Sequence, residues 1–249
     1  MIEFRILGSM EIAGDNVVVA PTPPKVRQVL ALLILSANQV VHVDSFIDEL
    51  WENKPPPSAI TTIQTYIYHL RRFVAKENLT QPTGELVRTK APGYMLRTDR
   101  MQIDEQRFRQ LARQGRNHLD NSEFELTSHV LNKALSLWSG PALADVNRGR
   151  VLEAQVQRLD EERLQTIETK IQADFALGRH REHIGELRAL TSTYPLNEWF
   201  HGRLIEALGR TGRRSEALHA YQRLRLVLND ELGLDPSPEL QDLQREVLA

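Results

Sequence analysis

The spacing of hydrophobic residues in the N-terminal part of the chain predicts short strands followed by helices. Apolar residues in positions 1–20 lie around two glycines, a pattern typical of strands joined by turns; they are Phe4, Ile6, Ile12 and Val17–Val19. A helix is expected to begin with Pro23 and Pro24, because proline suits a first helical turn. Apolar residues from Val26 to Ile34 then follow the spacing of one buried helix face. Asn38 is the expected end of this helix.

Two further helices are predicted, and the second one is long. Residues 40–43, VVHV, have the pattern of a short strand, after which Asp44 is expected to cap a helix that ends at Trp51. A run of prolines follows, and Ser58 is expected to cap a helix that extends to about Glu77. Its apolar residues recur at intervals of three and four and predict one narrow buried stripe; they are Ile60, Ile63, Ile67, Leu70 and Val74.

The other faces of this long helix carry few of the Glu and Ala residues that a solvated helix ordinarily uses. The polar set is Thr61, Thr62, Gln64, Thr65, Tyr68, His69, Arg71 and Arg72. Residues 86–96, LVRTKAPGYML, then predict a hairpin that turns at residues 91–93, with Arg88 and Lys90 beside its tip. A polar-faced helix is therefore followed directly by a basic hairpin.

The remainder of the chain has a helical pattern and contains a repeat. Residues 173–187 align with residues 207–221 at an offset of 34, which places Gly178 on Gly212. This offset is the tetratricopeptide period, in which a small turn residue joins two antiparallel helices. Each helix pair exposes an apolar face that a neighbour must cover, so we expect one stacked helical array over residues 99–249.

Charge and composition narrow the possible functions. The 249 residues carry 31 basic and 33 acidic side chains, so a nucleic-acid surface has to be local. Residues 60–97 supply such a surface, with six basic and two acidic side chains. The absence of cysteine excludes disulfides, thiolate chemistry and Cys-ligated zinc, and it fits a cytoplasmic protein. The strongest apolar run, residues 29–37, is too short to cross a bilayer, so no membrane partner is expected.

The order of the N-terminal elements is more informative than any one of them. Helix, short strand, helix, long polar-faced helix and basic hairpin follow one another as in a winged helix-turn-helix. Such a helix fits the DNA major groove, where Gln, Thr, His and Arg contact base edges, and the hairpin reaches phosphates or the minor groove. A solvated amphipathic helix followed by an unrelated hairpin is the alternative. The continuous order favours DNA binding.

Five longer strings extend the interpretation to nearly the whole chain. They are IEFRILGSMEI (residues 2–12), IQTYIYHLRRFV (63–74), VRTKAPGYML (87–96), LSLWSGPALADV (135–146) and RSEALHAYQRLRLVLNDELGLDPSPEL (214–240). Through them the chain resembles the Streptomyces antibiotic regulatory protein (SARP) family, whose members join an OmpR-type winged helix to a bacterial transcriptional activation domain. The last string is the most specific.

The resemblance implies a mainly α fold with two domains. Residues 1–98 would form the winged helix-turn-helix domain (α+β), and residues 99–249 an all-α, tetratricopeptide-like activation domain. The implied function is transcription activation of an antibiotic, or secondary-metabolite, gene cluster through direct repeats of double-stranded DNA near a promoter. RNA polymerase holoenzyme with its sigma factor is the expected partner, with self-association on DNA. No cofactor and no metal are implied, and the DNA-bound protein would be nucleoid-associated in the bacterial cytoplasm.

The resemblance also assigns DNA contacts to individual residues. Six residues of the long helix are expected to face bases or flanking phosphates: Thr61, Thr62, Gln64, Thr65, Tyr68 and His69. The expected phosphate contacts are Arg71, Arg72 and the indole N–H of Trp51, and the expected wing contacts are Arg88 and Lys90. Tyr68 and His69 occupy places where related winged helices often carry Arg or Ser, so the preferred base sequence does not follow from the resemblance.

Two other classes of function stay open on the residues alone. A tetratricopeptide-like array binds peptides in many proteins, so one alternative is an interaction adaptor without direct DNA readout. The other is an enzyme, although the sequence lacks the GxxxxGK[ST], GxGxxG and GxSxG motifs. His180 and His183 match neither HExxH nor HxxEH, which argues against a metal site. The aromatic residues of the array are expected in its core more often than in a ligand groove; they are Trp138, Trp199, Tyr194 and Tyr221.

Overall fold

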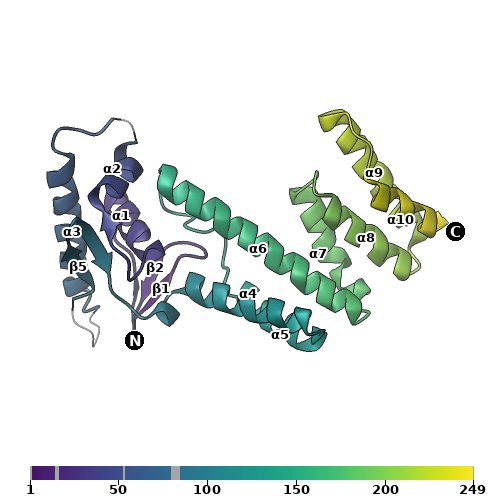
Figure 1. Ribbon diagram of the computed structural model, residues 1–249, viewed down its shortest axis with the longest axis horizontal. Helices are drawn as coiled ribbons and strands as arrows, with labels where there is room; N and C mark the ends of the chain where they lie inside the picture. The colour runs from purple at the N-terminus through teal and green to yellow at the C-terminus, as the bar shows by residue number, and fades with distance from the viewer. Residues whose placement is uncertain (1, 15–16, 53, 80–84, 249) are drawn as a thin grey trace. The chain divides into compact units, whose positions relative to one another are not determined.

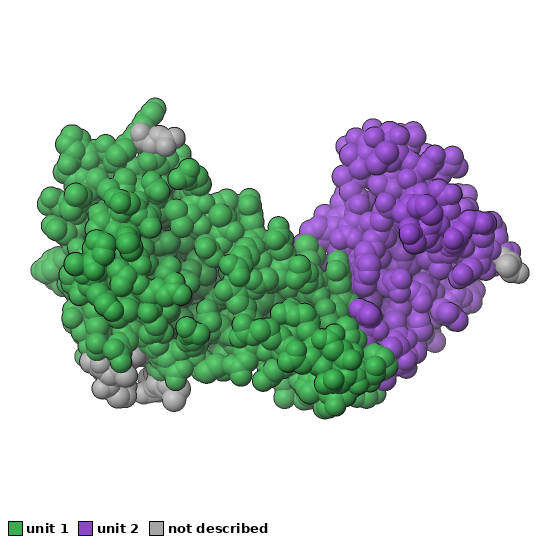
Figure 2. Space-filling view, in the orientation of Figure 1, with its two compact units in different colours: residues 1–170 green, residues 171–249 purple. Residues whose placement is uncertain are grey.

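The computed structural model of the chain describes residues 2–14, 17–52, 54–79 and 85–248. It divides into two compact units, residues 1–170 and 171–249, which are coloured separately in Figure 2. The fold is mainly helical, with small sheets near the N-terminus (Figure 1), so the predicted fold class is confirmed. The two units are defined by packing, and a functional boundary at residues 98/99 stays a prediction.

The first unit begins with a small antiparallel sheet in the order β1-β2-β3. Its strands are β1 (Glu3–Arg5), β2 (Glu11–Ala13) and β3 (Val18–Val19). Phe4 lies opposite Ile12 in the β1–β2 pair, and both side chains are fully buried. The predicted strands in the first part of the chain are therefore confirmed.

Three helices follow, close to the predicted positions: α1 (Pro24–Leu35), α2 (Val43–Trp51) and α3 (Ala59–Lys76). Of the two expected caps, one was wrong and the other is confirmed in its position only. His42 rather than Asp44 occupies the N-cap of α2, because the helix begins directly after a strand and Asp44 falls in its first turn. Ser58 is at the N-cap of α3, but its side chain makes no capping hydrogen bond; its carbonyl instead accepts from Thr62.

A second three-stranded sheet has the order β4-β6-β5. It consists of β4 (Val41–His42), β5 (Val87–Lys90) and β6 (Gly93–Leu96), all paired antiparallel. Lys90 lies opposite Gly93 at the end of the β5–β6 pair, which confirms the predicted hairpin. Gly93 also pairs with His42, so the hairpin is fixed to the strand that precedes α2.

Helices of the next segment share the core of the winged helix. After a short 3-10 helix η1 (Arg100–Gln102) come α4 (Asp104–Asp120), α5 (Phe124–Leu135) and α6 (Arg150–Ala176), of which residues 150–170 belong to this unit. One continuous hydrophobic cluster runs from Ile2 through Phe108 to Leu159. The first unit therefore buries the strands and α1–α3 together with parts of α4–α6.

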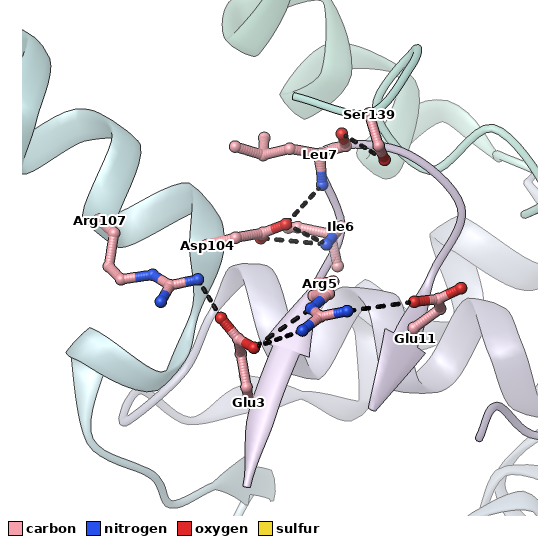
Figure 3. A network of polar contacts seen from close by, with 8 residues as sticks. All are labelled: Glu3, Arg5, Ile6, Leu7, Glu11, Asp104, Arg107 and Ser139. Carbon is pink, nitrogen blue, oxygen red and sulfur yellow. Dashed lines mark hydrogen bonds and ion pairs between the residues drawn. The ribbon is translucent and has the colours of Figure 1, made fainter. Parts of the chain in front are cut away.

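A buried carboxylate joins α4 to the end of β1 (Figure 3). The side chain of Asp104 accepts hydrogen bonds from the backbone N–H groups of Ile6 (2.9 and 3.0 Å), Leu7 (3.0 Å) and Glu105 (2.8 Å). Beside it, Glu3 accepts from both Arg5 and Arg107. The backbone N–H groups of Ile6 and Leu7, which follow β1, thus donate to a residue about a hundred positions further along the chain.

Two further carboxylates fasten the same parts of this unit. Asp145 accepts from the backbone N–H of Met10 at 2.8 Å and forms an ion pair with Arg27. Glu49, a residue of α2 that is only 2% exposed, accepts from the backbone N–H groups of Gly149 (2.6 Å) and Leu152 (2.9 Å) at the beginning of α6. The positive end of the α6 dipole therefore faces a buried negative charge.

Asp104 should make the stability of the chain depend on pH. Burial raises its pKa from 3.8 to about 6, despite the backbone N–H groups that favour its ionised form. The folded state then holds this proton over a pH range in which the unfolded chain has lost it, so the free energy of unfolding falls as the pH rises. From below pH 3.8 to above pH 6, we expect the wild-type chain to lose about 3 kcal/mol in total relative to Asp104→Asn. Urea unfolding of both proteins across this range measures it; parallel pH profiles would contradict the assignment.

The second unit contains the predicted repeat. It consists of the end of α6 followed by α7 (His180–Thr193), α8 (Glu198–Arg210), α9 (Arg214–Leu232) and α10 (Pro238–Leu248). Gly178 and Gly212 both adopt the left-handed conformation, with φ of 77° and 76°, in the turns before α7 and α9. Their backbone N–H groups bond to Phe175 and Gly209, which are again 34 residues apart, so the structure confirms the alignment.

His183 and Tyr221 of this unit are both buried and take part in its packing. The Nε2 atom of His183 lies 2.9 Å from an oxygen of the buried Asp174, and its Nδ1 lies 3.0 Å from Glu186. Tyr221 is buried, as expected for a core aromatic residue, whereas Trp199 is partly exposed. Among the described residues, no cluster of three or more metal-ligating side chains is found. No helix among them is long and apolar enough to span a bilayer.

Candidate nucleic-acid interface

Helix α3 has one buried face and one exposed face. Its buried residues are Ala59, Ile63, Ile67 and Leu70, which pack in the core with α1 and α2. The predicted inner stripe is confirmed at Ile63, Ile67 and Leu70 and approximately at Val74, which is partly buried. No Asp or Glu occurs between residues 59 and 76, so the exposed face of α3 carries no negative side chain.

Ile60 was placed wrongly by the spacing of apolar residues. Its side chain is 57% exposed, and Ala59 takes the buried position in the first turn instead. Ile60 therefore lies on the same exposed face as Gln64 and Tyr68, because these residues are four apart along a helix. The sequence held no signal for this exposure, because Ile60 continues the regular spacing of the buried residues.

The predicted base-contacting residues lie on the exposed or partly exposed side of α3. The hydroxyl groups of Thr62 and Thr65 donate to carbonyl groups four residues earlier, at 2.9 and 3.0 Å, so their protons are used within the helix. Thr61 and Gln64 are exposed, and neither side chain donates a hydrogen bond to another described residue. The amide of Gln64 is therefore available as both donor and acceptor, which is what adenine requires.

Further along the same face, aromatic and cationic side chains gather. Tyr68 is 56% exposed, and its ring meets that of His69 edge to face at 5.7 Å between centroids. The guanidinium carbon of Arg72 lies 5.8 Å from the centre of the Tyr68 ring, within the range of a cation–π contact. Arg72 is exposed and follows Tyr68 by one helical turn, so its charge stays at the surface where a phosphate could reach it.

Arg71 contacts the hairpin rather than open solvent. Its Nε and Nη2 atoms donate to the carbonyl of Val87 at 3.1 and 2.9 Å, and Nη2 also donates to Thr89 at 3.0 Å. The guanidinium is completed by an ion pair with Glu85 at 2.9 Å. Arg71 thus holds β5 against α3, and its expected phosphate contact stays a prediction that has to compete with these bonds.

The remaining predicted residues frame this surface. Lys90 is exposed at the end of β5, and no described residue forms an ion pair with it. Arg88 is partly buried, and its Nε donates to the carbonyl of Glu85 at 3.2 Å. Trp51 ends α2 and packs partly buried against the core. The exposed face of α3 and Lys90 therefore form the surface, and Arg71 fastens the hairpin to α3.

Two family models match the chain in sequence order. The first, described as the C-terminal part of transcriptional regulatory proteins, covers residues 19–96 and therefore α1–α3 and the hairpin. The second, the bacterial transcriptional activator domain, covers residues 103–248. Both descriptions are of transcription regulators, so neither favours the adaptor or the enzyme alternative.

Similar proteins match nearly the whole of this chain, and this chain spans a varying share of theirs. The regulatory protein DnrI of Streptomyces peucetius is 39% identical over 99% of this chain and 92% of its own. The transcriptional regulator RedD of Streptomyces coelicolor is 32% identical over 100% of this chain and 71% of its own. A solved structure of Mycobacterium tuberculosis EmbR, in complex with a low affinity phosphopeptide, superposes with a TM-score of 0.89 at 34% identity, over 99% of this chain and 65% of that one.

The geometry and the comparisons agree on the type of protein. An exposed helix face without carboxylates lies beside a hairpin with a free lysine, inside the region matched by the regulatory model. The helical remainder is matched by the activator model, and the regulators DnrI and RedD match 99% and 100% of this chain. The chain belongs to the SARP family of DNA-binding transcription activators, which join an OmpR-type winged helix to a bacterial transcriptional activator domain.

Proposed function

We propose that this activator controls a secondary-metabolite, or antibiotic, gene cluster by binding direct repeats near its promoter. The observation that carries the proposal is the exposed face of α3, where the Gln64 side chain forms no hydrogen bond with a described residue and no carboxylate repels DNA. Residues 1–98 would read the DNA, and residues 99–249 would contact RNA polymerase holoenzyme, including its sigma factor. Copies bound to adjacent repeats would touch one another, and the protein would act at the nucleoid in the cytoplasm.

Within this proposal, α3 reads bases from the major groove. Gln64 is placed to pair with adenine, and Ile60 and the methyl groups of Thr61 and Thr65 supply apolar contacts for thymine methyl groups. Thr62, Tyr68 and His69 extend the contact to flanking bases or sugars, while Arg72 and Trp51 are proposed to contact phosphates. Lys90, and Arg88 beside it, would bind phosphates from the hairpin. Arg71 would serve mainly to hold the hairpin at the correct distance from α3.

The binding test is a titration of the full chain with promoter fragments from its genomic neighbourhood. Fluorescence anisotropy at two salt concentrations, with random duplex as competitor, separates specific from non-specific binding. We expect one fragment to bind in the presence of competitor and footprinting to show repeated protected half-sites on one face of the duplex. Binding no tighter than that of random duplex would reject sequence-specific recognition by the chain alone.

Two substitutions should affect this titration in different ways. Lys90→Ala is expected to weaken binding to every duplex and to reduce the slope of log K against log salt by about 1, because one phosphate contact is lost. Gln64→Ala is expected to leave that slope unchanged and to cost about 1–3 kcal/mol on the preferred sequence only. The hairpin assignment fails if Lys90→Ala has the wild-type slope, and the readout assignment fails if Gln64→Ala discriminates between bases as well as wild type does.

A further inference from the structure

A groove in the second unit is lined by three helices and is not covered by any helix that the structure describes. Two adjoining hollows of about 470 and 390 Å³ share Arg188 of α7, Leu204 of α8 and Arg223 of α9. We call their combined surface the α7–α9 groove; its other main residues are His201, His219 and Leu226. Figure 1 shows α8 lying between α7 and α9 in this unit.

Helix α9 presents a second stripe of residues towards this groove. Its core stripe consists of Ala217, Ala220, Tyr221, Leu224 and Leu228. The groove stripe has the same three- and four-residue spacing and consists of His219, Gln222, Arg223 and Leu226. Leu226 is 62% exposed, although leucine is among the residues most often buried. One stripe of α9 packs in the core, and the groove stripe is left without a helix of the described residues to cover it.

The groove is locally positive on a unit that is negative overall. Residues 171–249 contain ten arginines, no lysine and twelve Asp and Glu residues. Glu216 is the one carboxylate among the groove residues, and it already bonds to Arg188 and, at 2.8 Å, to Arg213. Arg223 forms no ion pair or hydrogen bond with any described residue. Its guanidinium can therefore accept a carboxylate in two parallel hydrogen bonds without losing an existing partner.

His201 adds a buried polar atom without a partner. The side chain is 8% exposed, its Nε2 lies 3.1 Å from the carbonyl of Pro195, and burial lowers its pKa, so the ring is neutral and Nε2 carries the proton. Nδ1 is then an acceptor, and no described residue donates to it. Buried acceptors of this kind are uncommon because leaving them unbonded is costly. Because solvent does not reach this atom, binding of an occupant depends on the arginines and leucines of the groove and not on Nδ1 of His201.

We propose that the α7–α9 groove docks an acidic amphipathic helix of the transcription machinery. Its leucine-like side chains would pack on Leu204 and Leu226, and its carboxylates would pair with Arg223 and the outer side of Arg188. Docking of a helix by its apolar face into a groove is a common recognition mode. The proposal rests on the activator function proposed above, because that function requires a surface for the polymerase.

A direct test uses the full chain and a labelled helical peptide of Glu, Ala and Leu, as long as α7, 14 residues, with leucines on one face. We expect binding that Arg223→Glu with Leu226→Asp weakens by about tenfold or more. Arg225→Glu with Leu232→Asp is the matched control, since it makes the same exchanges at exposed positions of α9 outside the groove. Equal binding of a peptide with Lys in place of Glu, or no binding by wild type, would overturn the proposal.

Run-off transcription with purified holoenzyme separates the groove from the proposed function. The groove variant is expected to bind the promoter fragment like wild type but to lose activation, while the control variant keeps both. Full activation by the groove variant rejects this docking site and leaves the activator function intact. If wild type itself neither binds nor activates any promoter, the proposed function fails, and the peptide titration alone decides whether the groove binds acidic helices.

Discussion

Gly93→Ala is expected to lower the free energy of unfolding by about 3 kcal/mol or more and to abolish DNA binding. A Cβ atom at this position would lie 1.8 Å from the carbonyl oxygen of Val41, 2.8 Å from its carbonyl carbon and 2.9 Å from the Cα of His42. All three are backbone atoms, so no side-chain rotation relieves the contact. The β4–β6 pair has to separate, and the hairpin that carries Lys90 then loses its attachment to the strand before α2.

Gly185→Ala is a suitable control for this substitution. Gly185 is exposed in the middle of α7, and no neighbouring atom lies within 4 Å of an added Cβ. Alanine is the better helix former, so the control should raise stability by about 0.5–1 kcal/mol. Urea unfolding and promoter titration of both variants measure the contrast. A Gly93→Ala protein with the wild-type midpoint and wild-type affinity would show that the β4–β6 contact does not support the hairpin.

Glu49→Ala is expected to cost about 2–4 kcal/mol, the second largest effect, because it leaves one buried and one partly buried backbone N–H group without an acceptor. These are the groups of Gly149 and Leu152 at the beginning of α6, and the substitution also removes the negative charge that faces the helix dipole. Asp48→Ala is the control, since the side chain of Asp48 is 48% exposed and its carboxylate lies 3.6 Å from the guanidinium of Arg150, a type of pair worth about 1 kcal/mol or less.

The two Glu49 measurements are urea unfolding and amide hydrogen exchange. Global stability should fall in Glu49→Ala, and the amide of Leu152 should exchange faster than in the control. Glu49→Gln should lie between the two, because an amide keeps one acceptor oxygen for the two N–H groups. If the Leu152 amide exchanges at the wild-type rate in Glu49→Ala, another group caps α6.

Patterns among neighbouring residues predicted most of this fold, but they did not predict contacts between residues far apart in the sequence. The spacing of apolar residues located α1 and α3 because helix periodicity is a property of neighbouring residues. The 34-residue alignment located the turns at Gly178 and Gly212 for the same reason. Nothing near Glu49 in the sequence indicates that it caps a helix about a hundred residues later.

The sequence was enough to choose the residues of the candidate interface, but it did not show which of them bond to one another. Its polar residues could be chosen because an exposed helix face without carboxylates is visible in the sequence. Ile60 was missed because regular spacing does not show where a buried face ends within the first turn. The bonds of Arg71 to β5 were missed because charge alone does not distinguish an arginine that binds phosphate from one that fastens two elements.

The two left-handed glycine turns also have an evolutionary meaning. Gly178 and Gly212 repeat one backbone geometry 34 residues apart. A duplicated segment of 34 residues inserted between them would therefore pack against helices arranged like those that the original segment contacts. The continuous cluster that includes the elements of the proposed DNA interface ends at Leu159, before the first of these turns. Gain or loss of a whole repeat at this place would therefore leave the packing of the proposed DNA interface unaltered.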